Sequence, residues 1–305
     1  MRSAQRKKRI ENSKTKSRVF GLLIKVVIPV ALILLLLLVI KLNTKYWNGH
    51  DKLSFVTNNP DGTVLVTVLD PLLNEETNLV IPGDTEVNVA RGYGTLRIKN
   101  VWQLGLNEKL GGGLLAQTLT ESFLFPTNLW SDHGSDNTLN FIFKTKNTNI
   151  PFGDRLFAGL FALKIKAANK TDIDLAKSQF LHKEVLTDGK PGYVIMGTIN
   201  SRLTIYFSDN NMSDTATGKN LKFSLTDATG KSGVAGNVGQ ILEVLGGKVV
   251  AIDKVAKDDS LDCEVNGSNN YAVKKVADLF SCRKIMGNGS FDLELRLGAK
   301  FAKRF

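Results

Sequence analysis

The chain has 305 residues, of which 40 are lysine or arginine and 29 are aspartate or glutamate, so the formal net charge is +11. Residues 1–18 contain eight basic residues and one acidic residue, so this tail carries +7 and the other 287 residues carry only +4. The excess charge is therefore local, and the high pI gives no case for a nucleic-acid-binding domain. No nucleic-acid partner is expected.

A long apolar run follows the basic tail and predicts one transmembrane helix over residues 19–42. Residues 26–40 hold no polar side chain, and about 20 residues suffice to cross a bilayer core. No small-residue cleavage pattern follows the run, so an uncleaved signal-anchor is favoured over a cleaved signal peptide. Basic residues stay on the cytoplasmic side. The prediction is a single-pass protein of the cell membrane, with tail 1–18 in the cytoplasm and the domains outside it.

Beyond a polar stalk over residues 43–55, residues 56–217 are predicted to form one α/β domain. Short β-rich runs predict strands there, and apolar residues at helical spacing predict two helices. Pro126 ends the first helix. The expected strands are 63–69, 77–81, 139–143, 193–196 and 203–207, the expected helices are 113–125 and 153–168, and 90–95 is expected to be a loop.

A polar, turn-rich segment over residues 209–220 predicts a domain boundary. Residues 218–305 are then expected to form a second, smaller α/β domain with a βαββαβ-like order. Ser268 is the predicted N-cap of its second helix. The expected strands are 221–225, 248–252, 261–265 and 291–297, and the expected helices are 233–245 and 268–280.

Few residue patterns in the chain point to chemistry. The turn TDATGKSGVAG could bind an anion at a helix N-terminus, but it lacks P-loop and dinucleotide spacing, so a tight packing turn is favoured. Asp154 and Glu121 are interpreted as solvated or capping carboxylates rather than an acid–base pair. No cofactor is expected. A metal site is not expected either, because the three histidines are far apart in sequence: His50, His133 and His182.

Cys263 and Cys282 are the only cysteines of the chain. Both fall on the predicted outer side of the membrane, where disulfides form and persist. They lie in segments that are expected to be neighbouring elements. A disulfide is therefore favoured, and two buried free thiols are the alternative.

Residues 219–305 resemble the LytR C-terminal domain, a small α/β module of cell-envelope proteins. The resemblance is carried by the strand and turn LTDATGKSGVAG, the helices VGQILEVLGGKVV and SNNYAVKKVADLF, and the strand DSLDCEV. Its most specific part is the closing strand FDLELRLGAKF, where Leu297 and Gly298 precede Phe301. The turn departs from the family's Asn-Gly-Thr, because Asp227, Ala228 and Thr229 stand there. The resemblance implies a fold and an envelope location, and no catalytic residue.

Residues 56–217 resemble the LytR–CpsA–Psr domain, through GTVLVTVLDPLLNEETNLVIPGDTEVNV, GYGTLRIKNVWQLG and GGGLLAQTLTESF. The family transfers glycopolymers from a polyprenyl-pyrophosphate carrier to the cell wall with Mg²⁺. The arginine of its Ile-Pro-Arg-Asp-Thr motif holds the lipid phosphates. Here Gly83 replaces that arginine, while Asp84 keeps the motif aspartate. The family's aspartate before the first strand falls at Gly62, beside Asp61, and residues 130–217 offer no counterpart to its later arginine-rich stretch.

The resulting interpretation is a degenerate domain that kept the scaffold and lost the chemistry. The chain is expected to be a non-catalytic envelope protein that binds cell-wall glycan, a lipid-linked precursor or another envelope protein. The alternative is a polyprenyl-pyrophosphate-dependent glycopolymer transferase that uses Mg²⁺, with Asp84 retained and Arg91 and Arg97 in place of the lost arginine. Convergence of those three side chains on one pocket would favour the transferase. A transcription attenuator is disfavoured, because the domains are expected outside the cytoplasm and no DNA-reading motif is visible.

Overall fold

The computed structural model describes residues 27–31, 34–35, 38, 43–196, 200–213 and 218–305. The chain divides into two compact units, Met1–Lys45 and Tyr46–Phe305. In the first unit the described residues from 27 to 38 are helical, but most of the predicted span 19–42 and the whole of tail 1–18 lie outside the described residues. Among the helices that are described, none has the length and apolar character needed to cross a bilayer. The anchor and its topology stay predictions.

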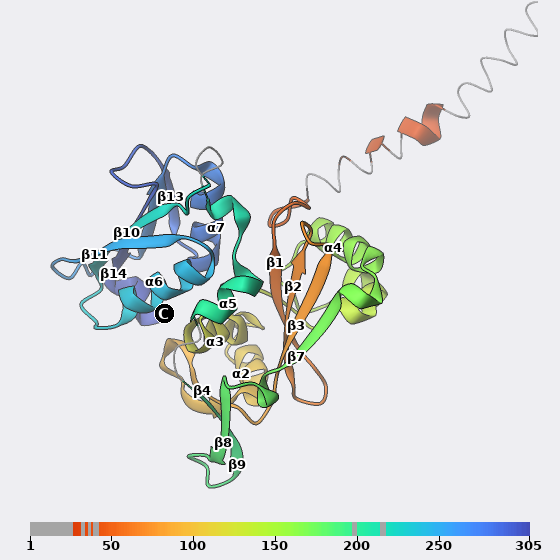
Figure 1. The fold of residues 1–305 in the computed structure, drawn as a ribbon, viewed down its shortest axis with the longest axis horizontal. Coiled ribbons are helices and arrows are strands. Elements are labelled where there is room, and N and C mark those ends of the chain that lie inside the picture. Colours follow the sequence, from red (N-terminus) through yellow and green to blue (C-terminus); the bar gives the residue numbers. More distant parts are fainter. Residues whose placement is uncertain (1–26, 32–33, 36–37, 39–42, 197–199, 214–217) are drawn as a thin grey trace, which may run out of the picture. The chain divides into compact units, whose positions relative to one another are not determined.

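The second unit is a mixed α/β structure (Figure 1). Its first sheet has the strand order β6-β1-β2-β3-β7. The three central strands form an antiparallel meander, and β6 and β7 join its two edges in parallel. Their β-branched residues alternate between two buried faces, as the sequence pattern predicts. The bounds are β1 (Leu53–Asn58), β2 (Val64–Asp70), β3 (Glu75–Ile81), β6 (Leu129–Ser131) and β7 (Lys170–Asp174).

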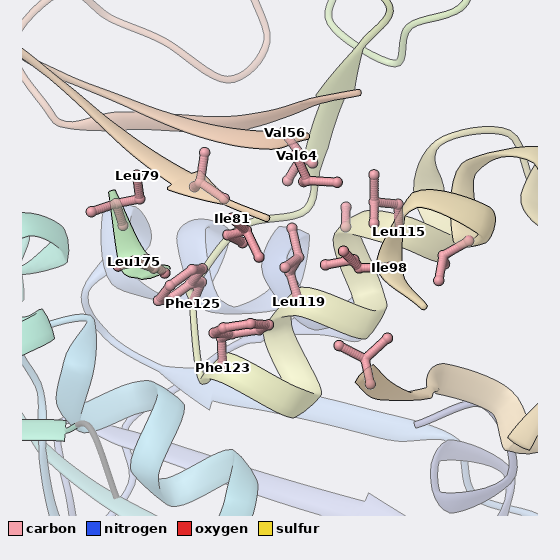
Figure 2. Close-up of a cluster of buried hydrophobic side chains, with 14 of the residues drawn as sticks. Val56, Val64, Leu79, Ile81, Ile98, Leu115, Leu119, Phe123, Phe125 and Leu175 are labelled. Atoms are coloured by element: carbon pink, nitrogen blue, oxygen red, sulfur yellow. The ribbon is translucent and has the colours of Figure 1, made fainter. Parts of the chain in front are cut away.

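Helices cover both faces of this sheet. On one face α2 (Val101–Asn107) and α3 (Gly113–Phe123) pack on the strands, and Ile81 and Leu119 belong to the buried cluster between them (Figure 2). On the other face lie α4 (Phe152–Lys164) and a π-helical turn, η4 (Asn140–Lys144). There the ring of Phe55 stacks on that of Phe141, with 5.2 Å between centroids. The result is a three-layer sandwich.

Two β-hairpins meet at the end of the sheet where β3 finishes. The first joins β4 (Glu86–Val89) to β5 (Gly94–Arg97) through the turn η1 (Ala90–Gly92), and the second joins β8 (Leu181–Val185) to β9 (Pro191–Ile195). The Tyr193 N–H donates to the Asp84 carbonyl oxygen at 3.1 Å, so the hairpins are in contact. Four 3₁₀ turns complete this part: η2 (Ile98–Asn100), η3 (Ser135–Asn137), η5 (Ala167–Asn169) and η6 (Leu175–Lys177).

The second sheet has the order β11-β10-β14-β12-β13. In it β12 runs antiparallel to β14, and the other neighbouring pairs are parallel. Its bounds are β10 (Lys222–Ala228), β11 (Lys248–Lys254), β12 (Cys263–Gly267), β13 (Arg283–Met286) and β14 (Leu293–Gly298), with α6 (Val234–Val244), α7 (Asn270–Phe280) and α8 (Ala299–Arg304). Phe207 and Val244 share one buried cluster. The predicted division at residues 217/218 falls between the sheets and stays a prediction.

Two predicted strands are helical instead. Residues 139–143 form the π-helical turn η4, and residues 203–207 belong to α5 (Asn200–Phe207). Each is an apolar run of only a few residues, and a run that short fits a strand or a buried helical turn equally well. The chain after α5 continues into the turn η7 (Asn210–Met212).

The predicted stalk and the predicted cap Ser268 also need correction. Within residues 43–55, Trp47 is buried, with 5% of its surface exposed, and Leu53 begins β1. The chain therefore enters the folded unit at Tyr46, because the aromatic residues pack on α4 rather than extend into solvent. At the start of α7 the N-cap is Asn269, whose side chain accepts from the Ala272 N–H at 3.1 Å.

Candidate functional site

The segment that corresponds to the family motif is a tight turn between β3 and β4. The Pro82 carbonyl oxygen accepts from the Thr85 N–H at 3.0 Å and from its hydroxyl at 2.7 Å. This double contact closes the turn over residues 82–85, since a threonine hydroxyl readily bonds to nearby backbone. Asp84 stands at the turn with about half of its side chain exposed.

Gly83 has no room for a side chain. A Cβ placed there would lie 2.3 Å from the carbonyl oxygen of Gly62 and 3.1 Å from the Cβ of Lys99. Gly62 itself has a φ of +85°, in the left-handed region that favours glycine. The positions that the resemblance assigns to a phosphate-holding arginine and to an aspartate are thus two glycines in backbone contact.

Asp61 does not stand in for the missing aspartate. Its carboxylate accepts from the Thr63 hydroxyl at 2.7 Å and from the Thr63 N–H at 2.9 Å. These two hydrogen bonds, the hydroxyl first, hold the pKa of Asp61 below its ordinary value. The side chain closes the β1–β2 turn, which is a common structural role for aspartate.

Asp84 belongs to an ion-pair network with Arg97, Lys99 and Asp188. It receives the Lys99 ammonium at 2.5 Å and Arg97 Nη1 at 2.9 Å. Arg97 also donates two hydrogen bonds to Asp188, from Nε at 2.7 Å and from Nη2 at 2.9 Å. The hydrogen bond from Lys99, followed by that from Arg97, lowers the pKa of Asp84.

The fork of Arg97 is fully engaged by the protein. Its two-pronged contact lowers the pKa of Asp188 and raises the pKa of the guanidinium, because each charge stabilises the other. The remaining donors reach the carbonyl oxygens of Pro191 and Lys190, at 3.1 and 3.3 Å. The network therefore holds the β8–β9 hairpin against the turn over residues 82–85. In it, the positive charges of Arg97 and Lys99 are paired with the carboxylates of Asp84 and Asp188.

Arg91 has different partners. It has a left-handed φ of 62° in η1, and its Nε donates to Gln117 Oε1 at 2.9 Å. Gln117 in turn donates to Glu121 at 3.0 Å and to the Arg304 carbonyl oxygen. Of the three candidate site residues, the structure brings Asp84 and Arg97 together and places Arg91 beside α3 and α8.

Neither Glu121 nor Asp154 is the solvated carboxylate that the sequence analysis expects. Burial raises the pKa of its carboxyl to about 8, although the hydrogen bond from Gln117 and the charges of Arg91 and Lys231 act in the opposite direction. The helical pattern of α3 puts Glu121 on the edge of the buried face, beside Gln117, which also donates to the carbonyl oxygen of the distant Arg304. Asp154, the other lone carboxylate, is fully buried and accepts backbone N–H groups from Tyr46 and Trp47.

The remaining predicted features lie in the second sheet. In the glycine-rich turn, Asp227 accepts from the Thr229 N–H at 3.0 Å, and the Lys231 ammonium donates to the Ala302 carbonyl oxygen at 2.8 Å. These contacts agree with a packing turn. Cys263 and Cys282 are joined in a disulfide. Within the part of the chain that the structure describes, no group of three or more histidine, cysteine or acidic residues is placed to hold a metal ion.

Comparisons with known proteins give matches of structure alone. No protein-family model matches the chain, and no curated protein matches it. The crystal structure of B. subtilis TagT is 14% identical, with a TM-score of 0.31, covering 50% of this chain and 88% of its own. The LytR-CPS2A-Psr family protein YwtF (TagT) with bound octaprenyl pyrophosphate lipid is 14% identical, with a TM-score of 0.33, covering 50% and 87%. B. subtilis TagV is 18% identical, with a TM-score of 0.24, covering 32% and 41%.

Proposed function

We propose that this chain is a membrane-anchored envelope protein that keeps a LytR–CpsA–Psr-like scaffold and binds its ligand without transferring a glycopolymer. The observation that carries the proposal is the contact between Gly62 and Gly83. A phosphate-holding guanidinium at residue 83 would need a Cβ 2.3 Å from a carbonyl oxygen, which is far inside van der Waals contact. The motif turn is built around a glycine.

The commitment of Arg97 supports the same proposal. An arginine that holds a pyrophosphate must offer donors to phosphate oxygens, but Arg97 gives its donors to Asp84, Asp188 and two carbonyl oxygens. Arg91 is bonded to Gln117 instead. Two positive side chains that could replace the lost arginine are therefore used to hold hairpins and helices in place.

The proposed ligands are a polyprenyl-pyrophosphate lipid, the glycan that such a lipid carries, or an envelope protein. A solved neighbour holds octaprenyl pyrophosphate, and another is described as TagT bound to LI-WTA. These two compounds are accordingly the probes for binding. We expect the full chain in vesicles to bind one of them without consuming it.

A transfer assay tests the proposal directly. The full chain is incubated with a polyprenyl-pyrophosphate-linked glycan, an acceptor glycan and Mg²⁺, and product is measured by mass spectrometry. We expect no product from the wild type. Turnover that Asp84→Ala abolishes would overturn the non-catalytic proposal, provided that Asp259→Ala, a change of an exposed acid in another ion pair, leaves the turnover intact.

The proposed location is the cell membrane, with the N-terminus inside and the Tyr46–Phe305 unit outside. Its support is the basic tail before the apolar run and the disulfide, which persists in an oxidising space. Protease added to intact cells should digest the Tyr46–Phe305 unit and spare the tail. Protection of the unit in intact cells would contradict this topology.

A further inference from the structure

The outward side of α4 is apolar, although the solvent side of a helix that packs on a sheet is normally polar. Asp154, Ala158 and Ala162 face inward and are at most 1% exposed. The opposite side carries aromatic and aliphatic residues. We define the α4 patch as six large apolar residues of η4, its N-cap Leu139 and α4, each between 38% and 67% exposed: Leu139, Phe143, Phe152, Phe157, Leu160 and Leu163.

The two elements that carry the α4 patch are joined at the surface. The ring of Phe143 in η4 lies 6.2 Å from that of Phe152 in α4, measured between centroids. The guanidinium of Arg155 lies over the same Phe152 ring, 5.9 Å from its centroid. The exposed side chains therefore form one surface across both elements, and contiguous apolar surface on a folded protein commonly marks an interaction site.

The exposed charges of the segment that carries the α4 patch are basic, and Asp132, just before it, accepts from the Lys146 N–H at 3.1 Å. Between residues 138 and 168 the lysines Lys144, Lys146, Lys164 and Lys166 are all exposed. Asp154 is the only acidic residue in that stretch of the sequence, and it is buried under Tyr46 and Trp47. Apolar residues surrounded by lysines fit a bilayer with anionic headgroups, because the lysine stems lie along the apolar phase while the ammonium groups meet phosphate.

The chain enters the Tyr46–Phe305 unit beside α4. The backbone N–H groups of Tyr46 and Trp47 each donate to the Asp154 carboxylate at 3.1 Å, and the Trp47 ring meets Phe161 edge-on at 5.5 Å. Only three residues lie between Tyr46 and the predicted end of the span at residue 42, and the four steps from residue 42 to Tyr46 reach about 14 Å when fully extended. The first turn of α4 is thus tethered near the point where the chain would leave the bilayer.

A second group of exposed apolar residues lies at the same end of the sheet. Leu72 and Leu73, in the β2–β3 turn, are 69% and 60% exposed. The Lys52–Asp70 ion pair, at 3.0 Å, puts this turn beside the start of β1, and the Asn169 amide donates to the Asn74 carbonyl oxygen just after α4. The turn therefore lies near both the end of α4 and the start of β1, and it adds exposed apolar residues there.

We propose that the α4 patch docks on the anionic lipid surface of the membrane that anchors the chain. The inference rests on the proposed anchor for its geometry, since the tether brings the patch to the bilayer. Docking would fix the orientation of the unit on the membrane. The ion-pair network of Asp84 lies at the end of β3, whereas the β2–β3 turn lies at the end that meets the lipid.

Fluorescence quenching by lipid-attached nitroxides tests the docking. The full chain is reconstituted in vesicles of phosphatidylcholine with phosphatidylglycerol, carrying one environment-sensitive label at Leu163→Cys. The matched control carries it at Val185→Cys in β8, which is 69% exposed and belongs to the hairpin at the opposite end of the sheet. The native cysteines are joined to each other, so only the new thiol reacts. We expect quenching at residue 163 and none at residue 185.

Two further variants separate docking from other contacts. Leu160→Glu in the labelled chain should abolish quenching at residue 163, while Met286→Glu, an exposed apolar-to-acidic change on β13, should leave it intact. Absence of quenching at residue 163, or equal quenching at residue 185, overturns the docking. A third outcome also overturns the docking: the label becomes less accessible to solvent as the protein density rises, and phosphatidylglycerol has no effect. In that case a second copy of the chain covers the patch.

The membrane anchor is tested separately in the same vesicles. Extraction of the chain by alkaline carbonate would refute the proposed span, whereas quenching at residue 163 still reports whether the α4 patch meets lipid. If the chain resists extraction but shows no quenching at residue 163, the docking is refuted and the proposed anchor is not.

Discussion

The carbonyl oxygen of Gly62 occupies the place where Gly83 would carry a Cβ, with only 2.3 Å between the two positions. Lys99 seals this contact, because its N–H donates to the Gly83 carbonyl oxygen at 3.1 Å and its Cβ would lie 3.1 Å from the added atom. The two glycines are therefore linked, because the backbone of Gly62 fills the space that a side chain at residue 83 would need. A side chain at residue 83 would force the two turns apart, whereas one at residue 62 would meet Lys99 at 3.4 Å and would be strained by the φ of +85°.

Gly83→Ala should destabilise the protein, because the methyl group would collide with backbone that has no freedom to move away. Overpacking of this kind lowers the free energy of unfolding by about 1–3 kcal/mol. The matched control is Gly236→Ala in α6, where an added Cβ meets nothing within 4 Å and alanine is the better helix former. Urea unfolding of both variants checks the pair. Equal stability of Gly83→Ala and wild type would contradict the tight contact.

Replacement of Arg97 by glutamine should loosen the β8–β9 hairpin. The change removes the donors shared by Asp84 and Asp188 and leaves the two carboxylates without their common cation. Amide hydrogen exchange should speed up in residues 181–195 and stay unchanged in β12, which lies in the other sheet. Unaltered exchange in the hairpin would show that the network does not hold it.

Acid should weaken the same network. The pKa values of Asp84 and Asp188 are lowered in the folded protein, so the stabilisation is present above the ordinary carboxyl value of 3.8 and is lost as the pH falls below it. Hairpin exchange should therefore accelerate in acid in the wild type. In Arg97→Gln that acceleration should be smaller, since the shifted pKa values return toward normal.

Glu121→Gln should stabilise the protein most at high pH. Burial raises the folded pKa to about 8 from 4.5, so between these values the folded protein keeps a proton that the unfolded chain has lost. Stability from this group is full below pH 4.5 and falls as the pH rises toward 8, by on the order of 1 kcal/mol per pH unit. The variant should lack this slope in chemical unfolding measured across the range. An unchanged slope would exclude Glu121 as its source.

Loss of the Cys263–Cys282 disulfide should destabilise the second sheet. The cysteines are 19 residues apart, and closing a loop of that size contributes about 3 kcal/mol in the chain-entropy model. The double alanine variant, or reduction of the wild type, should lower the free energy of unfolding by about that amount, as measured by chemical denaturation. Two thiols that react with maleimide in the exported, unreduced protein would show that the bond does not form.

Local pattern was enough to predict the principal helices and several strands. The structure has helices where periodic apolar residues predict them, in α3, α4, α6 and α7, because each side chain repeats on one face every three to four residues. Short strands and turns were less secure. Residues 139–143 and 203–207 give no periodic signal long enough to decide, and the packing of their neighbours makes them helical.

The sequence by itself determined the absence of the motif arginine, the location of the positive charge in the tail, and the apolar run that predicts an anchor. Tertiary structure alone decided that Asp84 and Asp188 both pair with Arg97, that Arg91 donates a hydrogen bond to Gln117, and that Glu121 is partly buried. The physical reason is that these relationships join segments far apart in the sequence, 91 residues for Arg97 and Asp188, and such pairings depend on sheet order and on how hairpins and helices dock. Hydrophobic periodicity records which side of an element is buried, but it does not record what buries it.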